Sequence, residues 1–453
     1  MRPPVVRFEP LPLGCPEVNL AIVGAGACGL STAIFLRDAG IECALLERDP
    51  QPQGSTALSS GFMPAAGTQV QRAAGVLDDS AERFAADIQH KARGTAAGHL
   101  VAAYSEAIAP ALDALQSRHG LEFELLDGFL YPGHSVRRMH TLPQRTGRAL
   151  VAALDAAAQR AGALLLTQAR VCELWCEPDG RVLGVGYERP GGGIEHLACR
   201  ALVLANNGFG GNAAMVAQHL SAMRDAIYAG HVGNDGSAIA WGRALGAACA
   251  DLGGYQGHGA WAVPQGALIT WALMMQGGVQ VNAHGERFHD ETAGYSEAAV
   301  AVLGQPGGVA WNVFDDKLLA LGRTFPDFVD AEAAGALRSA ADVEALAAHI
   351  GCPSAALHAT LAGTVLTPPL HAIKVTGALF HTQGGLSIDA QCRVLREDGT
   401  VLPNLLAAGG AARGVSGNAV WGYLSGNGLL SAVAGGFIAA RTLTVSAAYA
   451  QRG

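Results

Sequence analysis

An apolar segment that ends in a glycine turn opens the chain. A strand-like run at residues 18–23 leads into the glycine turn 24–29, an Ala- and Leu-rich helix up to Asp38 and a second apolar run at 43–46. Apolar runs of this length between turns are typical of buried strands, and the intervening segment has the composition of a helix. The pattern therefore predicts the first βαβ unit of a doubly wound α/β sheet.

Similar elements recur further along the chain. Helical periodicity returns at 80–91, 99–116 and 147–161, and the last of these segments leads into a short strand at 163–166. Two more apolar strands, 201–205 and 405–408, also run into small-residue turns. A dinucleotide-binding fold assembled from distant pieces of sequence requires strands of this kind.

The character of the chain changes between residues 257 and 371. This stretch has few strand-to-helix turns, contains Trp261, Trp271 and Trp311, and includes a mixed Ala-rich helical segment at 331–362. We therefore predict an α/β protein (α+β overall) with a discontinuous, Rossmann-like cofactor-binding domain at 1–256 and 372–453. An inserted catalytic or capping domain at 257–371 interrupts it.

Composition narrows the classes of partner. Half of the 453 residues are hydrophobic, 15% are charged, and the formal net charge is -8 without a basic cluster, which argues against a nucleic-acid partner. The apolar tract 428–440 is interrupted by Ser431, Gly435 and Gly436, and it falls short of the roughly 20 residues of a membrane span. The opening segment lacks the apolar core of a secretory signal, so we expect a cytoplasmic protein.

The cysteines form no motif for a haem or a metal centre that could carry electrons. The nine cysteines are scattered, with no C-x-x-C pair and no haem-attachment motif, so we expect reduced core thiols and no metal site. Electrons should therefore pass to a diffusible acceptor, namely oxygen, a quinone or a carrier protein.

The glycine turn has the spacing of a dinucleotide fingerprint, G-x-G-x-x-G. Gly24 permits the tight turn, Gly26 lets the backbone approach a pyrophosphate, and Gly29 lets helix and strand pack closely. The helix N-terminus faces the negative charge of the ligand. Glu47, at the end of the next strand, is placed to accept hydrogen bonds from the adenosine ribose.

Further motifs resemble one flavoprotein family along residues 19–441. After the fingerprint come GSTALSSG (54–61), TGRAL (146–150), LVLANNGFGGN (202–212), GERFHDE (285–291), HTQGGL (381–386), LLAAGGAARG (405–414) and YLSGNGLLSA (423–432). In this order they resemble the family of soluble fumarate reductases, succinate dehydrogenase flavoprotein subunits and 3-ketosteroid Δ1-dehydrogenases. The resemblance implies FAD as the cofactor. It implies that FAD is bound by Gly24, Ala25, Gly26, Gly29, Glu47, Arg48, Ser55, Ser59, Gly61, Val171, Gly410, Asn427 and Leu429.

Two departures from the family pattern concern the cofactor. The family's covalent flavin linkage uses a histidine in the region of residues 55–60, which has none here, so FAD is expected to be noncovalent. The family's A-A-G-E turn reads Ala-Ala-Gly-Gly at 407–410, which removes a carboxylate near the ribityl chain. The helix that starts near Gly428 is expected to aim its positive end at the flavin.

The arginines that fumarate reductases use on a dicarboxylate are missing. Counting outward from the shared motifs, the proton-donor arginine falls on Tyr295 and the carboxylate-binding arginine on Tyr423. The Glu and Arg of the proton relay fall on Trp271 and Met274. A site without these cations would neither hold nor protonate fumarate.

The replacements resemble the ketosteroid dehydrogenase branch. That resemblance implies that Tyr295, as phenolate, removes the proton α to a carbonyl, while Tyr423 and the amide of Gly426 polarise the carbonyl oxygen. The β hydride would pass to flavin N5. A tyrosine base needs a pKa below its usual value of about 10, to which the polarised site and the flavin would contribute.

Three more residues are candidates for substrate binding. His258 and His381 occupy positions where fumarate reductases hold substrate carboxylates, although each also suits a satisfied buried histidine. Trp271 either lines the pocket or fills the core of the inserted domain. If the histidines touch substrate, a ring ketone with a carboxylate is favoured, and the chain also looks short for a ketosteroid enzyme.

The sequence therefore predicts an FAD-dependent desaturase of a small cyclic ketone such as 4-oxocyclohexanecarboxylate. One alternative is a 3-ketosteroid Δ1-dehydrogenase, and another is a reductase of an activated alkene in the fumarate or urocanate manner. A third is a flavin-binding protein without turnover.

Overall fold

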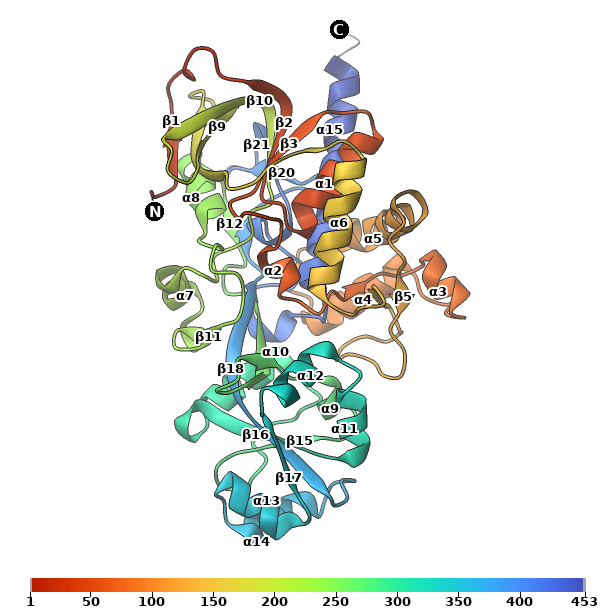
Figure 1. Cartoon of the computed structure of the whole chain (residues 1–453). Coiled ribbons are helices and arrows are strands. Elements are labelled where there is room, and N and C mark those ends of the chain that lie inside the picture. Colours follow the sequence, from red (N-terminus) through yellow and green to blue (C-terminus); the bar gives the residue numbers. More distant parts are fainter. Residues whose placement is uncertain (1, 451–453) are drawn as a thin grey trace.

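The computed structural model describes residues 2–450 and places two large sheets in two lobes (Figure 1). The upper lobe holds a nine-stranded sheet in which β10 is central. Its path runs β1-β8-β9-β10-β2-β3-β7, and β21, which also pairs with β20, lies against β10. The strands are β1 (Val5–Arg7), β2 (Glu17–Val23), β3 (Cys43–Leu46), β7 (Leu164–Leu166), β8 (Arg170–Cys176), β9 (Val182–Glu188), β10 (Ile194–Leu204), β20 (Arg393–Leu395) and β21 (Val401–Ala407).

Parallel pairing gathers the predicted strand ends at one edge of this sheet. β2 pairs in parallel with β3 and β10, and β10 pairs in parallel with β21, so that Val23, Leu204 and Ala407 lie in register. The turns that follow these strands therefore meet, although they are far apart in sequence. The expected α/β architecture assembled from distant pieces is confirmed.

Helices cover this sheet, and the longest is buried. α1 (Ala27–Asp38) lies between α6 (Gly147–Arg160) and α15 (Asn427–Ala450), and α15 also packs on α5 (Gly98–His119) (Figure 1). The expected shortness of the C-terminal apolar tract is wrong, because α15 has 24 residues and its Asn427–Val445 portion meets the length and composition of a membrane span. However, 61% of the tested part of that span is buried inside the protein, as in a core helix.

The lower lobe is built on a seven-stranded sheet around β18. Its path runs β14-β13-β18-β16-β15, with β11 and β17 also paired to β18. The strands are β11 (Ile227–Tyr228), β13 (Tyr255–Ala262), β14 (Ala267–Leu268), β15 (Val279–Val281), β16 (Val309–Asp315), β17 (Leu337–Ala340) and β18 (Leu370–Thr382). In Figure 1, β18 runs from this lobe up towards the other one.

The remaining elements are short. The strands are β4 (Met63–Pro64), β5 (Glu124–Leu125) and β6 (Met139–Thr141) in one small sheet, and β12 (Cys249–Ala250) and β19 (Gly385–Leu386) in another. The helices are α2 (Gly54–Ala57), α3 (Gln69–Ala73), α4 (Ala81–Lys91), α7 (Ala213–His219), α8 (Ser237–Ala244), α9 (Ala272–Met275), α10 (Tyr295–Leu303), α11 (Asp316–Gly322), α12 (Pro326–Ala333), α13 (Val343–Ile350) and α14 (Ser354–Leu361), with 3₁₀ turns η1 (Ser221–Met223), η2 (Pro306–Gly308), η3 (Gly409–Ala411) and η4 (Val420–Gly422).

Two details differ from the sequence pattern. The segment 331–362 is not helical throughout, because β17 interrupts it and pairs with β18. The predicted domain boundaries, 256/257 and 371/372, fall inside β13 and β18.

Candidate active site

A cavity that is partly open to solvent is lined by both lobes. Its wall contains the turn after β2, the segment 54–62, the end of β18 and the N-terminus of α15. Every predicted site residue lines it except Ala25, Gly29 and Asn427. The predicted cofactor, substrate and catalytic residues thus surround one continuous space.

The fingerprint glycines have the conformations that their roles require. Gly24 has φ +99°, and a Cβ there would lie 2.8 Å from the carbonyl oxygen of Ala205. A Cβ on Gly29 would lie only 1.9 Å from the carbonyl oxygen of Gly24, so helix and strand approach too closely for a side chain. The N-terminus of α1 is thereby held against the cavity, as an anionic pyrophosphate requires.

Glu47 is turned towards the same turn. Its Oε2 accepts a hydrogen bond from Ala25 N at 2.8 Å, and its Oε1 accepts one from Asp49 N at 2.9 Å. Burial raises the pKa of Glu47, and the two backbone hydrogen bonds partly oppose that rise. These hydrogen bonds therefore fix the carboxyl group just after the C-terminal end of β3, where it could bind a ribose.

The segment after β3 supplies a polar edge. Thr56 Oγ1 accepts a hydrogen bond from Ala27 N at 3.0 Å, which ties α2 to the start of α1. Ser55 Oγ accepts from Asn234 Nδ2 at 2.8 Å, and Ser59 Oγ donates to the carbonyl of Thr56 at 2.7 Å. The Gly-rich stretch 229–237 also lines this end of the cavity, and the sequence prediction missed it despite its turn-like composition.

Asn207 explains the glycine where the family has a glutamate. A Cβ on Gly410 would lie 2.1 Å from Asn207 Oδ1 and 3.0 Å from His381 Nε2. Asn207 has φ +67° and its Oδ1 accepts from Gly208 N at 2.8 Å, so it is locked in place. The amide of Asn207 therefore stands where a larger residue at position 410 would have to go.

The N-terminal end of α15 reaches the cavity through Gly428 and Leu429. Asn427, in contrast, is fully buried and donates from Nδ2 to Ser416 Oγ at 3.0 Å. The N-terminal end of a 24-residue helix carries partial positive charge, which stabilises an anion bound close to it. The small residues, the acidic ribose site and this helix end together fit FAD.

Four aromatic residues meet at the other end of the cavity. The rings of His258 and Tyr295 stack with centroids 4.7 Å apart, and the Tyr295 and Tyr423 centroids are 6.1 Å apart. The ring centroid of Trp271 lies 5.7 Å from that of His258 and 6.3 Å from that of Tyr295. Trp271 both lines the cavity and belongs to the core of the lower lobe, so its two predicted roles coincide.

The local architecture explains how these side chains converge. Tyr295 is the first residue of α10, Tyr423 follows η4, and His258 lies on β13 opposite Ala378 of β18. Shortly before Tyr295, the carboxylate of Glu291 pairs with Arg287 and accepts a hydrogen bond from Gln280 N at 2.8 Å. The backbone carbonyl of Glu291 accepts a hydrogen bond from Trp271 Nε1 at 3.0 Å. Arg287 is thus an anchor for its turn.

Burial dominates the titration of both tyrosines. It raises the pKa of Tyr423 to about 12, although the backbone of Gly428 and of Gly426 and the hydroxyl of Tyr295 lower it by hydrogen bonding. Burial also raises the pKa of Tyr295 well above its usual value, followed by the charge of Tyr423, while Ser425 lowers it. The expected lowering of the Tyr295 pKa is therefore not provided by the polypeptide.

Both candidate histidines are neutral. Burial lowers the pKa of His258 to about 3 and that of His381 to about 4. His258 Nδ1 accepts from Ala260 N at 3.1 Å, and His381 Nδ1 lies 2.7 Å from Gln383 Nε2. Each imidazole can therefore offer an Nε2–H donor but no positive charge.

Residues without a local motif complete this end of the cavity. Tyr131, Thr270, Phe325 and Asp327 line it, and a reader of the sequence would find no pattern that joins them. Hydrogen bonding with Thr270 opposes the burial that raises the pKa of Tyr131. Only their meeting in space identifies them.

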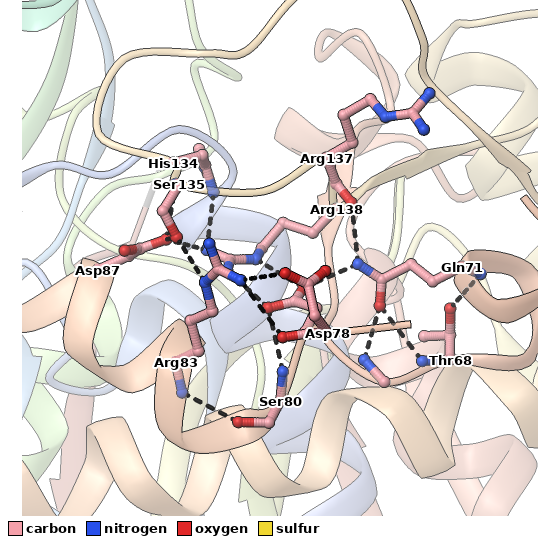
Figure 2. Close-up of polar contacts among 12 residues, drawn as sticks. Thr68, Gln71, Asp78, Ser80, Arg83, Asp87, His134, Ser135, Arg137 and Arg138 are labelled. Carbon is pink, nitrogen blue, oxygen red and sulfur yellow. Dashed lines mark hydrogen bonds and ion pairs between the residues drawn. The ribbon is translucent and has the colours of Figure 1, made fainter. Parts of the chain in front are cut away.

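Figure 2 shows a network of ion pairs and hydrogen bonds around Arg138 and His134, and this network reaches the loop after Tyr423. His134 Nε2 donates to the carbonyl of Ser425 at 3.0 Å, and Arg138, with a fully buried side chain, pairs with Asp79 at 2.8 Å and also with Asp87. His134 Nδ1 lies 3.4 Å from Arg138 Nη1. The network fixes one side of the loop that carries Gly426.

Known proteins share this arrangement of sequence and fold. The chain is 28% identical over 443 residues to the probable fumarate reductase Ifc3 of Shewanella frigidimarina, covering 93% of this chain and 74% of the relative. It is 24% identical over 518 residues to the 4-oxocyclohexanecarboxylate 2-dehydrogenase of Sinomonas cyclohexanicum, covering 87% of each. The predicted resemblance is confirmed.

A ketosteroid enzyme has the same fold. The structure of 3-ketosteroid-Δ4-(5α)-dehydrogenase from Rhodococcus jostii RHA1 superposes with a TM-score of 0.76 and 23% identity, covering 98% of this chain and all of that one. The two chains therefore share the fold over nearly their whole lengths.

The cofactor follows from the family. A family model described as an FAD binding domain matches residues 19–429, which confirms FAD and the predicted fold. The chain belongs to the FAD-binding domain family, and the protein is an FAD-dependent oxidoreductase.

Proposed function

We propose that the protein is a desaturase that forms a carbon–carbon double bond next to the carbonyl of a small cyclic ketone. The observation that carries this proposal is the meeting of Tyr295 and Tyr423, whose rings lie 6.1 Å apart in the cavity, beside the Gly426 backbone. Hydroxyl and amide donors suit a ketone oxygen, whereas a dicarboxylate calls for fixed cations.

The roles of the two tyrosines follow from their surroundings. Tyr423, with the Gly426 N–H, would donate to the ketone oxygen and stabilise the enolate that forms when the α proton leaves. Tyr295, as phenolate, would take that proton, and the β carbon would lose a hydride as the double bond forms. FAD supplies the hydride acceptor. We propose that a diffusible oxygen, quinone or carrier protein then takes the electrons.

The same geometry also supports a second candidate, the reduction of an activated alkene. The raised pKa of Tyr295 keeps its hydroxyl protonated, which suits a proton donor to carbon. Relatives named as fumarate and urocanate reductases share the family's sequence pattern. 3-Ketosteroid Δ1-dehydrogenase is a third candidate, because a structure of such an enzyme shares the fold over 95% of this chain.

Flavin absorbance under anaerobic conditions separates these candidates. The oxidised protein is mixed with cyclohexanone, 4-oxocyclohexanecarboxylate, a 3-oxosteroid or succinate, and the photoreduced protein with fumarate or urocanate. Bleaching by a ketone that Tyr295→Phe abolishes supports the desaturase. The control Tyr255→Phe changes a buried tyrosine outside the cavity lining and should bleach normally. If an unsaturated acid reoxidises the reduced flavin and no ketone bleaches the oxidised flavin, the desaturase proposal fails and the reductase is supported.

A further inference from the structure

Among the residues described by the structure, the tyrosine end of the cavity holds one carboxyl group and no cation. The arginines in the described cavity wall are Arg48 and Arg170. Both lie at the opposite end, where Arg48 is 3.6 Å and Arg170 is 4.0 Å from the carboxylate of Asp235. Since the histidines near Tyr295 are neutral, a carboxylate bound there would meet no charged arginine, lysine or histidine of the described cavity wall.

Asp327, near the start of α12, is the acid at this end. Its Oδ2 accepts a hydrogen bond at 3.1 Å from Ser60, which belongs to the segment predicted to bind the cofactor. Asp327 lines the cavity together with Tyr131 and Tyr295. Asp327 therefore faces the space in which substrate would lie.

The neighbours of Asp327 leave its charge largely exposed to that space. Burial raises its pKa, Ser60 lowers it by hydrogen bonding, Asp330 raises it and Arg148 lowers it. Arg148 is exposed on α6 and does not line the cavity, so water screens its charge. A substrate anion would thus approach a half-buried carboxylate without a compensating cation.

We propose that Asp327 sets the charge selectivity of this site, so that the substrate is a cyclic ketone without a carboxylate. A ring hydroxyl opposite the ketone would donate a hydrogen bond to Asp327, whereas a ring carboxylate would be repelled. This inference rests on the proposed function. It replaces 4-oxocyclohexanecarboxylate, favoured by the two histidines in the sequence, with an uncharged ring ketone.

Three ketones that differ only at C4 test the proposal: cyclohexanone, 4-hydroxycyclohexanone and 4-oxocyclohexanecarboxylate. kcat/KM is measured at about pH 8, where carboxylates are ionised. We expect the wild type to prefer the hydroxy ketone to the carboxylate ketone at least tenfold. Asp327→Asn should reduce this preference about tenfold, the factor that one pKa unit of charge interaction represents. Asp330→Asn, on the same helix but exposed, is the matched control and should keep the preference.

Binding separates a failure of this inference from a failure of the proposed function. Kd for the same ketones is measured from the shift of the flavin spectrum in Tyr295→Phe, which does not need turnover. A wild type that favours the carboxylate ketone, or an Asp327→Asn variant with an unchanged ratio, would overturn the charge selectivity alone. If no ketone bleaches the flavin but the Kd values follow the expected order, the selectivity stands and the desaturase does not.

Discussion

The titration of Tyr295 gives the sharpest prediction about the chemistry. Tyrosine has an ordinary pKa of about 10, so at about pH 8 only about 1% would be phenolate. Burial and the neighbouring Tyr423 raise the pKa of Tyr295 further, so its ionised fraction in the protein is smaller still. If phenolate takes the α proton, the rate of flavin reduction by a saturating ketone should rise about tenfold per pH unit between about pH 7 and 9.

Replacing the hydroxyl tests this reasoning. Tyr295→Phe should lower the rate by about 10²–10⁴-fold, the usual contribution of a positioned general base, or about 2.7–5.4 kcal/mol of barrier. It should also flatten the dependence on pH. The assay is anaerobic stopped-flow absorbance of the flavin across the pH range, with Tyr255→Phe as control.

A flat pH profile in the wild type, or the full slope in the Phe variant, would refute the role of Tyr295 as the base. Reoxidation of the reduced flavin by an unsaturated acid, at a rate that falls with rising pH, would instead indicate that the protonated Tyr295 hydroxyl donates a proton to carbon. That result would favour the reductase.

Three further predictions concern the cofactor site and its support. Gly29→Ala should yield protein without FAD, because the new Cβ would lie 1.9 Å from the Gly24 oxygen; flavin absorbance per chain after gel filtration measures this, and a yellow variant would contradict it. Gly410→Ala should weaken FAD binding, because the new Cβ would lie 2.1 Å from Asn207 Oδ1, and the double variant with Asn207→Gly should restore binding. Titration of the apoprotein with FAD measures both effects. If the double variant did not recover FAD binding, Asn207 would be excluded as the obstacle. Arg138→Met should destabilise the protein by about 3–5 kcal/mol, because the buried carboxylate of Asp79 and the partly buried carboxylate of Asp87 lose their partner. Arg137→Met, at the neighbouring surface position in Figure 2, should change stability by about 0.5 kcal/mol or less in urea unfolding; equal effects would count against the buried network.

Local pattern was sufficient for the elements that bind the dinucleotide. β3 has the predicted bounds, and α1 ends at the predicted Asp38, because apolar runs and glycine spacing act within a few residues. β17 was missed because this four-residue strand lies in an Ala-rich stretch and exists only through pairing with the distant β18. Its Leu337–Ala340 sequence alone does not distinguish a strand from a helix.

The residues of the candidate site also fall into two groups, those in local sequence motifs and those that only the fold brings together. Tyr295 and Tyr423 could be singled out because each stands in a recurrent motif, and the structure brings them together. Asp327 and Tyr131 belong to no motif, and only the structure shows that both line the cavity between the two lobes. The titration of Tyr295 also depends on burial, which residue spacing does not reveal.

The path of β18 limits how this protein can be re-engineered. One end of the strand lies at the centre of the lower sheet, while His381 at its other end lies beside Gly410. Cutting at 256/257 and 371/372 would sever β13 and β18 within their hydrogen-bonded ladders, so the lower lobe cannot be exchanged as a cassette at these points. A chimaera that takes its substrate-binding lobe from a relative must carry both strands whole, together with His381 at the end of β18.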